Sequence, residues 1–261
     1  MIKVLMATYH RPKLLAKTLN SLQEEIDKIR KADYGRFQLF IFDNNSGEEV
    51  RGMLLAFQNK NEEVAVLSLS DTNIGKAKAL NSFLPNIEDD DIVCSFDSDL
   101  VIENSLSGKF FGDGAALFTD KFLKHHPASV IVPDQVGNGQ HLIEKNWSQT
   151  APPTKFSSPF EDAYVESEFG FHVAGGCLFT RGSTFKGVGG YRENRGLFGG
   201  NDGFFLLDAS RFCHLPIYVM RYLIVYHPPD EDAGYAEWKK KAQDQQRAFQ
   251  RCLSYKGYYE S

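Results

Sequence analysis

The chain has 261 residues, of which 42% are hydrophobic and 24% are charged. This composition is typical of a folded globular protein and excludes a wholly disordered one, and the length fits one large α/β domain or two small ones. Lys and Arg number 29 and Asp and Glu number 34, so the net charge is −5. That balance argues against general binding of duplex nucleic acid, which needs a basic surface.

The cysteines and the apolar runs both predict a cytoplasmic protein. The four cysteines are dispersed, at Cys94, Cys177, Cys213 and Cys252; this fits free thiols in a reducing compartment and leaves no closely spaced pair for zinc. The apolar run at the N-terminus is too short for a signal peptide. Because no run reaches about 18 apolar residues, we expect no membrane-spanning helix.

Strands and helices alternate through the first part of the chain. Apolar and β-branched runs predict strands over Ile2–Thr8, Phe37–Phe42, Val64–Leu69 and Ile92–Phe96. Helices are predicted from Pro12 to about Arg30, over Glu48–Phe57, and after Gly75 to about Leu84. This alternation is typical of a parallel sheet with helices on its faces.

The second part of the chain has a weaker pattern. It predicts a helix over Ala115–Phe122 and strands over Val130–Val132, Phe171–Thr180 and Ile217–Tyr226. Residues 134–168 are rich in Pro, Gly and polar residues and predict a long loop, of a kind that is usually functional or mobile. Apolar positions from Tyr235 onward predict a terminal amphipathic helix.

Polar segments follow the predicted parallel strands, where ligands bind in sheets of this kind. They are Thr8–Arg11, Asp43–Ser46, Asp71–Lys76 and Asp97–Asp99. Asp97 and Asp99 are two residues apart, so both can point to the same side of an extended chain. Paired carboxylates suit Mg²⁺ or Mn²⁺, and such a cation can neutralise a diphosphate. The alternative is a solvated acidic turn.

Five motifs, in order, resemble those of glycosyltransferase family 2. Ala7–Pro12 is similar to the family's T-Y-N-R-P opening, and Phe42–Ser46 is similar to its D-N/D-x-S step. Asn73–Asn81 resembles N-x-G-K-x-x-A-L-N, Phe96–Asp99 matches D-x-D, and Gly199–Phe205 resembles the E/N-D acceptor motif. Each motif alone is weakly specific, but all five in order at domain-sized spacing form a strong resemblance.

The resemblance covers about residues 1–228 and implies a single-domain GT-A fold. This is an α/β, Rossmann-like fold with a mostly parallel central sheet flanked by helices. Residues 1–100 would form its nucleotide-binding half and residues 101–228 its acceptor-binding half. Residues 229–261 would form a C-terminal tail with the amphipathic helix. The stretch that follows His227, Pro228–Asp232, is expected to be mobile and able to close over donor and metal.

The resemblance also implies a nucleotide-sugar donor, most often a UDP-sugar. The nucleotide-binding residues that it implies are Thr8, Tyr9, Arg11, Asp43, Asn73, Gly75, Lys76, Asp97 and Ser98. Asp43 can accept the imide N–H of uracil or can cap the turn that follows it. Lys76 can meet the phosphates as a point charge or can lie solvated at a helix start. His10 replaces the family's Asn, so no side-chain role is assigned to it.

A divalent cation, Mn²⁺ or Mg²⁺, is the cofactor that the resemblance implies, with Asp97, Asp99 and His227 as its ligands. Asp99 would bind the cation directly, whereas Asp97 would contact ribose or reach the cation through water. Imidazole suits Mn²⁺ better than Mg²⁺. The alternative for His227 is a structural hydrogen bond at the end of a strand.

Asp202 is the predicted general base, because an acceptor hydroxyl must lose its proton as it attacks the anomeric carbon. Its alternative role is that of a carboxylate at a helix N-terminus, and the two roles are compatible. Donor sugar and acceptor would lie against Gly175, Gly176, Gly200 and Asn201. Many family members carry Glu or Asp in place of Asn201, so Asp202 is the carboxylate that remains at this point.

The predicted function is therefore a metal-dependent, inverting transfer of sugar to a hydroxyl of a glycan or lipid-linked acceptor. Bacterial surface-polysaccharide biosynthesis is the common setting of the family. Two alternatives are a sugar-phosphate nucleotidyltransferase, which would want a Gly-rich basic loop after the first strand, and an inactive nucleotide-sugar or glycan-binding protein. The basic residues of the last helix predict a solvated face or, as a second interpretation, weak peripheral attachment to an anionic inner membrane face.

Overall fold

The computed structural model describes residues 1–31, 36–105, 107–119, 128–137, 140–141, 154–155, 163–166, 176–193, 201–229, 234–242 and 244. The strands are β1 (Ile2–Thr8), β2 (Phe37–Asp43), β3 (Ala65–Leu69), β4 (Ile92–Phe96), β5 (Val101–Asn104), β6 (Val130–Gly137), β7 (Gln140–His141), β8 (Thr154–Lys155), β9 (Ala163–Glu166), β10 (Cys177–Arg181) and β11 (Ile217–Tyr226). The helices are α1 (Pro12–Lys31), α2 (Glu48–Lys60), α3 (Lys76–Asn81), α4 (Phe110–Ala116), α7 (Gly182–Val188) and α8 (Asn201–Leu207), and a further helix spans 234–242.

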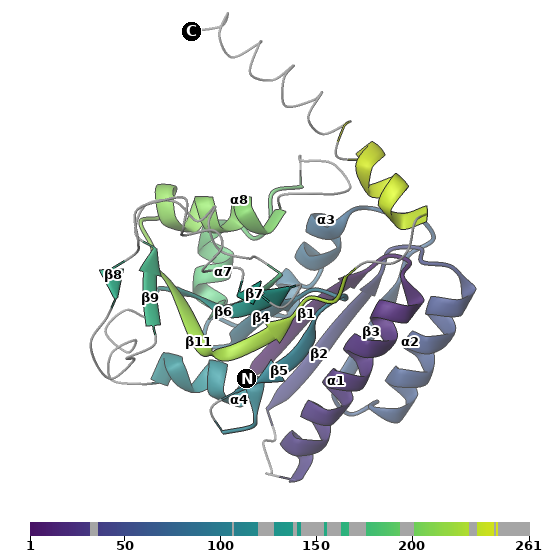
Figure 1. Ribbon diagram of the computed structural model, residues 1–261, viewed down its shortest axis with the longest axis horizontal. Coiled ribbons are helices and arrows are strands. Elements are labelled where there is room, and N and C mark those ends of the chain that lie inside the picture. Colours follow the sequence, from purple (N-terminus) through teal and green to yellow (C-terminus); the bar gives the residue numbers. More distant parts are fainter. Residues whose placement is uncertain are drawn as a thin grey trace, which may run out of the picture.

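The strands form one sheet through the centre of the molecule (Figure 1), in the order β3-β2-β1-β4-β10-β6-β11-β9-β8. β3, β2, β1 and β4 are parallel to one another. β10 runs antiparallel to β4 and to β6, and β6 and β11 are again parallel. The predicted α/β fold with a mostly parallel central sheet is confirmed, and the carboxyl ends of β1, β2 and β4 lie at one edge of it.

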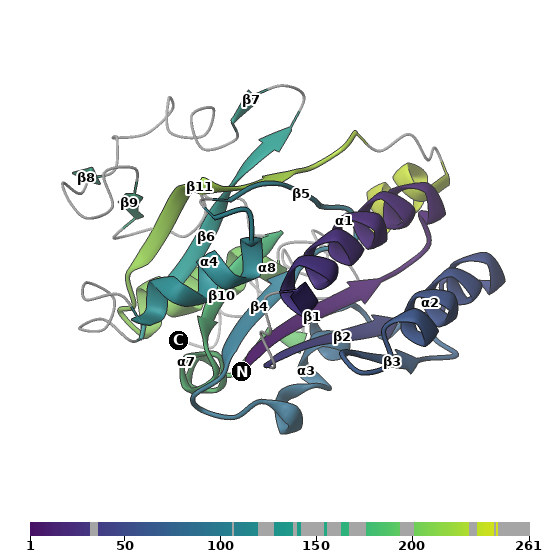
Figure 2. The ribbon, with the colours of Figure 1, turned by 90° about the horizontal axis from the view of Figure 1, so that it is seen from below.

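Helices cover both faces of this sheet (Figure 1, Figure 2). Side chains alternate along β1, so Val4 and Met6 belong to one apolar cluster and Leu5 to the other. The first cluster includes buried side chains of α1, α2 and α4, and the second includes those of α3, α7 and α8. Each helix therefore buries its apolar stripe against a sheet face, as a layered α/β domain requires.

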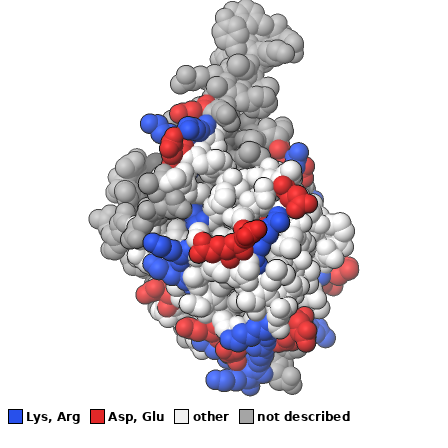
Figure 3. Space-filling model, turned by 90° about the vertical axis from the view of Figure 1, so that its right-hand side faces the viewer, with Lys and Arg blue, Asp and Glu red and all other residues white. Residues whose placement is uncertain are grey.

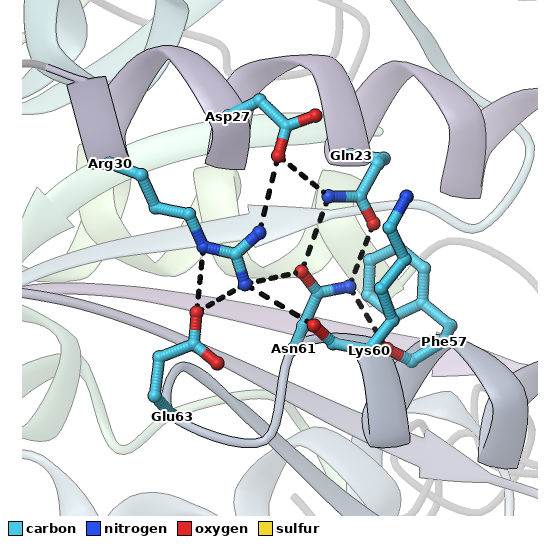
Figure 4. Close-up of polar contacts among 7 residues, drawn as sticks. All are labelled: Gln23, Asp27, Arg30, Phe57, Lys60, Asn61 and Glu63. Atoms are coloured by element: carbon cyan, nitrogen blue, oxygen red, sulfur yellow. Dashed lines mark hydrogen bonds and ion pairs between the residues drawn. The ribbon is translucent and has the colours of Figure 1, made fainter.

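The C-terminal end of α1 is held against the end of α2 by polar side chains (Figure 4). Arg30 donates from Nε to Glu63 at 2.7 Å and from Nη2 to Asn61 Oδ1 at 2.9 Å. Buried Asn61 in turn donates to Gln23 Oε1 and to the carbonyl of Phe57, both at 2.9 Å. This network lies at the opposite end of α1 from the residues after β1, so it stabilises the scaffold and not the candidate site.

Charges are mixed on the face that Figure 3 shows. Acidic and basic side chains are interspersed there, and neither sign covers an extended area. The net charge of the whole sequence is −5, and the described residues of this face form no continuous basic track for a nucleic-acid backbone.

The helix predicted over Ala115–Phe122 begins earlier than expected, because α4 starts at Phe110. Gly112 and Gly114 lower the helix propensity of this segment, which hides it in the sequence. Packing compensates: Phe110 is buried, and a Cβ on Gly114 would lie 2.6 Å from the ring of Phe179. Leu117–Thr119 continues as a short 3₁₀ turn, and 120–122 lie outside the described residues.

The long loop predicted over 134–168 is wrong in part. β6 continues from Val130 to Gly137 because its residues pair with β11, and β9 pairs with the other edge of β11. The strand predicted over Phe171–Thr180 is described from residue 176, where β10 spans Cys177–Arg181. β5 was not predicted. These strands form because distant segments pair, a signal that local patterns do not contain.

Candidate nucleotide-sugar site

A pocket of about 170 Å³ opens at the edge of the sheet where the parallel strands end. Its walls come from the ends of β1 and β4, the segments after β2 and before α3, the residue after β11 and the helix 234–242. The lining residues are Ala7, Thr8, Tyr9, Arg11, Asn44, Asn73, Lys76, Asp97, Ser98, Asp99, His227, Tyr235, Trp238 and Lys239. Most of the predicted nucleotide and metal residues thus share one pocket.

The turn between β1 and α1 has a strained backbone. His10 and Arg11 both have positive φ, 54° and 57°, which costs a residue with a Cβ on the order of 1–3 kcal/mol. Pro12 then begins α1, where its missing N–H is not needed. The turn directs Arg11 across the pocket, where Nη1 donates to Asp99 Oδ2 at 2.5 Å.

The Asp97–Asp99 turn is held from both sides. The buried hydroxyl of Thr18, on α1, donates to the carbonyl of Ser98 at 3.0 Å, and the backbone N–H of Asp97 donates to the carbonyl of Gly176 at 2.8 Å. Asp99 is buried, and its Oδ1 has no hydrogen-bond partner among the described residues. A buried carboxylate oxygen without a donor is costly, so the role of Asp99 as a ligand-binding residue stays a prediction that this geometry allows.

His227 reaches Asp99 from the far end of the sequence. β11 pairs antiparallel with β5, so that Tyr226 lies opposite Val101, close to the end of the acidic turn. The backbone N–H of His227 donates to the carbonyl of Val136 at 2.8 Å. These contacts fix the backbone and leave Nε2 of His227 3.2 Å from Asp99 Oδ2.

Lys76 connects the two sides of the site. Its Nζ lies 2.5 Å from Asp97 Oδ1 and 2.7 and 2.8 Å from the two oxygens of Asp202. Lys76 is the first residue of α3, Asp97 follows β4, and Asp202 lies in the first turn of α8. The predicted base and the predicted metal ligand therefore share one ammonium group.

Charges shift the protonation equilibria of the pocket. Burial acts to raise the pKa of Asp99, but the hydrogen bond from His227 and the charge of Arg11 outweigh it, so that the pKa lies well below its usual range. The same hydrogen bond raises the pKa of His227. Burial raises the pKa of Asp97 to about 7, although Lys76 acts in the opposite direction. For Lys76, the two carboxylates outweigh burial and raise the pKa, so the ammonium form is favoured.

Several predicted residues lie behind the pocket surface. Asp43 is buried: Oδ1 accepts from the Ser46 N–H at 3.0 Å and Oδ2 from Arg51 Nε at 2.9 Å. This is the arrangement of the alternative in which Asp43 stabilises the turn, and its contact with a base stays a prediction. Gly75 has φ 87°, and its backbone N–H donates to Asn73 Oδ1 at 2.9 Å.

The predicted sugar-binding residues are described in part. Gly176 lies against the acidic turn, because a Cβ there would be 3.4 Å from Asp97 Oδ2. Gly175 and Gly200 lie outside the described residues, as do residues 230–232 of the expected mobile segment and the side chain of Asn201. Their roles stay predictions.

Asn44 and Asn81 carry positioning contacts that the sequence interpretation did not assign. Asn44 accepts the Ile74 N–H on Oδ1 at 3.2 Å and so joins the end of β2 to the loop before α3. Asn81 donates to the Tyr191 carbonyl at 2.7 Å and accepts the Tyr191 N–H at 2.9 Å. Both residues stand inside motifs recognised in the sequence, which is the signal that could have identified them.

The helix 234–242 contributes aromatic side chains to the pocket. The Tyr9 and Trp238 rings lie 4.7 Å apart between centroids, and the Arg11 guanidinium carbon lies 4.2 Å from the centre of the Tyr235 ring. A neighbouring cavity of about 310 Å³ is lined by Tyr9, His10, Arg11, Pro12, Gly234, Tyr235 and Trp238. The sequence predicted this helix but not its place at the site.

Within the described part of the chain, no three His, Cys, Asp or Glu side chains are grouped closely enough to hold an ion. Arg11 and Lys76 form ion pairs with Asp99 and Asp97. Within the same residues, no helix is both long and apolar enough to cross a membrane.

The strand order and the pocket at the strand ends define a GT-A type of α/β protein. The chain belongs to glycosyl transferase family 2, whose family model matches residues 3–185. No curated protein matches the chain.

Solved structures share the fold at low sequence identity. Residues 1–349 of S. aureus TarS give a TM-score of 0.57 at 19% identity, and the match covers 87% of this chain and 60% of that one. GalNAc-T7 with UDP, GalNAc and Mn²⁺ gives a TM-score of 0.62 at 12% identity, and the match covers 88% of this chain and 44% of that one. The mannosyltransferase PcManGT from Pyrobaculum calidifontis, in complex with GDP-Man and Mn²⁺, gives a TM-score of 0.61 at 14% identity, and the match covers 91% of this chain and 59% of that one. The chain thus spans about half the length of these structures.

Proposed function

We propose that this protein is an inverting glycosyltransferase that moves a sugar from a UDP-sugar, with a divalent cation, to a hydroxyl of a glycan or lipid-linked acceptor. One observation carries the proposal. Asp97, Asp99 and His227 line one pocket at the strand ends, and Lys76 joins Asp97 to Asp202 through contacts of 2.5–2.8 Å. Family membership and the TarS structures with UDP and with UDP-GlcNAc support this choice of donor.

In this proposal the nucleotide lies against β1 and the loop before α3. Thr8, Tyr9, Asn73 and Ser98 line the pocket beside the acidic turn. Tyr9 presents an aromatic face, which suits stacking with a base or ribose. Arg11 and Lys76 supply the positive charge that a diphosphate needs.

The residues present fit a divalent cation by their chemistry. Asp97 and Asp99 are hard oxygen donors, His227 is a nitrogen donor that favours Mn²⁺, and Asp99 Oδ1 is buried without a hydrogen-bond partner among the described residues. The cation, when bound, neutralises the charge that develops on the leaving diphosphate. GalNAc-T7 and PcManGT are both solved with Mn²⁺.

Asp202 acts as the base in this proposal. Its carboxylate accepts the proton of the acceptor hydroxyl while that oxygen attacks the anomeric carbon and the bond to the diphosphate breaks. One carboxylate opposite the leaving group would suffice for an in-line displacement, and the inverting outcome is what the resemblance to the family implies. The predicted surroundings of Asp202, Gly200 and Asn201, would then face the sugars.

A thermal-shift screen of UDP- and GDP-sugars, each with and without Mn²⁺, tests the donor and the cation together. A ligand at about 100 times its Kd contributes about 2.7 kcal/mol, which raises the Tm by about 5–10 °C in a chain of this size. We expect this rise for a UDP-sugar with Mn²⁺ and its loss in Asp99→Ala.

Asp71→Ala is the matched control, because the Asp71 side chain is 99% exposed. It should behave as the unaltered protein does. A screen in which no nucleotide sugar raises the Tm would overturn the proposed function. Calorimetry in which Asp99→Ala binds UDP and Mn²⁺ with unchanged affinity would remove Asp99 from the metal site.

A further inference from the structure

The bridge formed by Lys76 is incompatible with the roles assigned to its partners. The ammonium has three N–H donors, and three carboxylate oxygens lie within 2.8 Å of Nζ: one from Asp97 and two from Asp202. In this arrangement no donor remains for a phosphate. Asp202, with both oxygens against the ammonium, is also poorly placed to accept a proton from a hydroxyl.

The bridge also covers the oxygen that a cation would need. Nζ of Lys76 lies 2.5 Å from Asp97 Oδ1, and Nη1 of Arg11 lies 2.5 Å from Asp99 Oδ2. A divalent ion entering this pocket would meet two fixed positive charges on the carboxylates that attract it. Like charges at such distances repel strongly where water is partly excluded, so the ion and the two side chains compete for the same oxygens.

The backbone of Lys76 is fixed, but its side chain has room to move. Gly75 precedes it with φ 87°, and the next residue, Ala77, is buried. The Lys76 side chain is 21% exposed and borders the pocket. Four methylene groups let the ammonium change partners without a shift of α3.

We propose that Lys76 is a positioning residue that exchanges partners when the donor binds. In the empty pocket it holds Asp97 and Asp202 together. The diphosphate of the donor then draws the ammonium away, which releases Asp202 toward the acceptor and Asp97 toward the cation. This inference rests on the proposed function and adds an order to it: the cation enters with the nucleotide and not before it.

Calorimetry of Mn²⁺ binding, with and without UDP, tests this order on the full chain. For the unaltered protein we expect weak Mn²⁺ binding alone and binding roughly tenfold or more tighter with UDP present. Lys76→Met removes the competing charge, so Mn²⁺ alone should bind roughly tenfold more tightly, and the coupling to UDP should shrink. The KM for the donor should rise and kcat should fall.

Two further variants separate charge from structure. Lys76→Arg keeps the positive charge and should restore weak binding of Mn²⁺ alone. Lys78→Met changes an exposed lysine of the same helix and should match the unaltered protein. Circular dichroism checks folding, and Lys76→Gln replaces Lys76→Met if the latter does not fold.

The outcomes distinguish this inference from the function on which it rests. Suppose that the unaltered protein binds UDP with Mn²⁺, and that Lys76→Met and Lys76→Gln bind Mn²⁺ alone no more tightly than the unaltered protein does. The proposed exchange of partners is then wrong, and the proposed function stands. If the unaltered protein binds Mn²⁺ alone as tightly as with UDP, the order is wrong. If it binds no UDP with any cation, both proposals fail.

Discussion

Asp202 lies between the start of a helix and the ammonium of Lys76, and part of its side chain is exposed. It lies in the first turn of α8, where the backbone N–H groups favour a negative charge, and 21% of its side chain is exposed. The ammonium of Lys76 adds a second stabilising charge. Proton acceptance from a hydroxyl requires a carboxylate that the hydroxyl can reach, and the proposed exchange of Lys76 would free this one.

Asp202→Asn should therefore separate binding from turnover. The amide keeps the shape of the side chain but cannot accept the proton, so we expect turnover to fall by roughly 10²–10⁴ while UDP binding is retained. UDP release measures turnover, and calorimetry measures UDP binding. Asp71→Asn is the control for the loss of a carboxylate, and near-normal turnover in Asp202→Asn would remove Asp202 from the mechanism.

The sequence predicted single residues best where one strand and its exit defined them. Asp97 and Asp99 follow β4, whose bounds were predicted as found, so their place at the strand ends followed from the pattern. The contact between Lys76 and Asp202 joins residues 126 positions apart. It depends on how α3 and α8 are positioned by the second apolar cluster, which no local pattern specifies.

Helix α3 is an element with a contact at each end. Lys76 begins it at the pocket, and Asn81 ends it by pairing with both backbone groups of Tyr191. Gly190 has φ 68°, and a Cβ there would lie 2.5 Å from Asn81 Oδ1. The glycine, the amide and the short helix therefore form one unit that fixes the approach to Lys76.

Asn81→Ala should break this unit. The two backbone groups of Tyr191 lose their partners, and the free energy of unfolding should fall by about 1–3 kcal/mol. Urea unfolding measures this change. Asn86→Ala alters an exposed asparagine just beyond the same helix and should change stability little. Equal stabilities for both variants would mean that the Asn81 amide does not hold Tyr191.

A helix or strand could be predicted where its own apolar residues recur at the spacing of a helix or a strand. α1 buries Leu15, Leu22 and Ile26 at helical spacing and was predicted to within a residue of its end. α4 contains two glycines, and β5 has little burial of its own. Both form because the rest of the molecule supplies a surface or a strand to pair with, and that information is not local.

The C-terminal part of the described chain contributes side chains to the pocket. The helix 234–242 lies beyond the segment that the family model matches, yet Tyr235 and Trp238 line the pocket. The predicted domain boundary at residue 228 stays a prediction. What the structure adds is that side chains beyond that residue contact the turn after β1, so the pocket is lined by residues from both ends of the described chain.

Trp238→Ala should weaken donor binding more than it weakens the fold. The Trp238 ring lies 4.7 Å from that of Tyr9, and aromatic pairs contribute about 0.5–1.5 kcal/mol beyond the area they bury, so we expect UDP affinity with Mn²⁺ to fall by roughly 2- to 10-fold. Calorimetry measures the affinity and thermal unfolding the stability. Glu237→Ala is the control on the same helix, because its ion pair with Lys241 is largely exposed and such pairs contribute about 0–1 kcal/mol. If both variants bind UDP as the unaltered protein does, the helix supports the domain without taking part in donor binding.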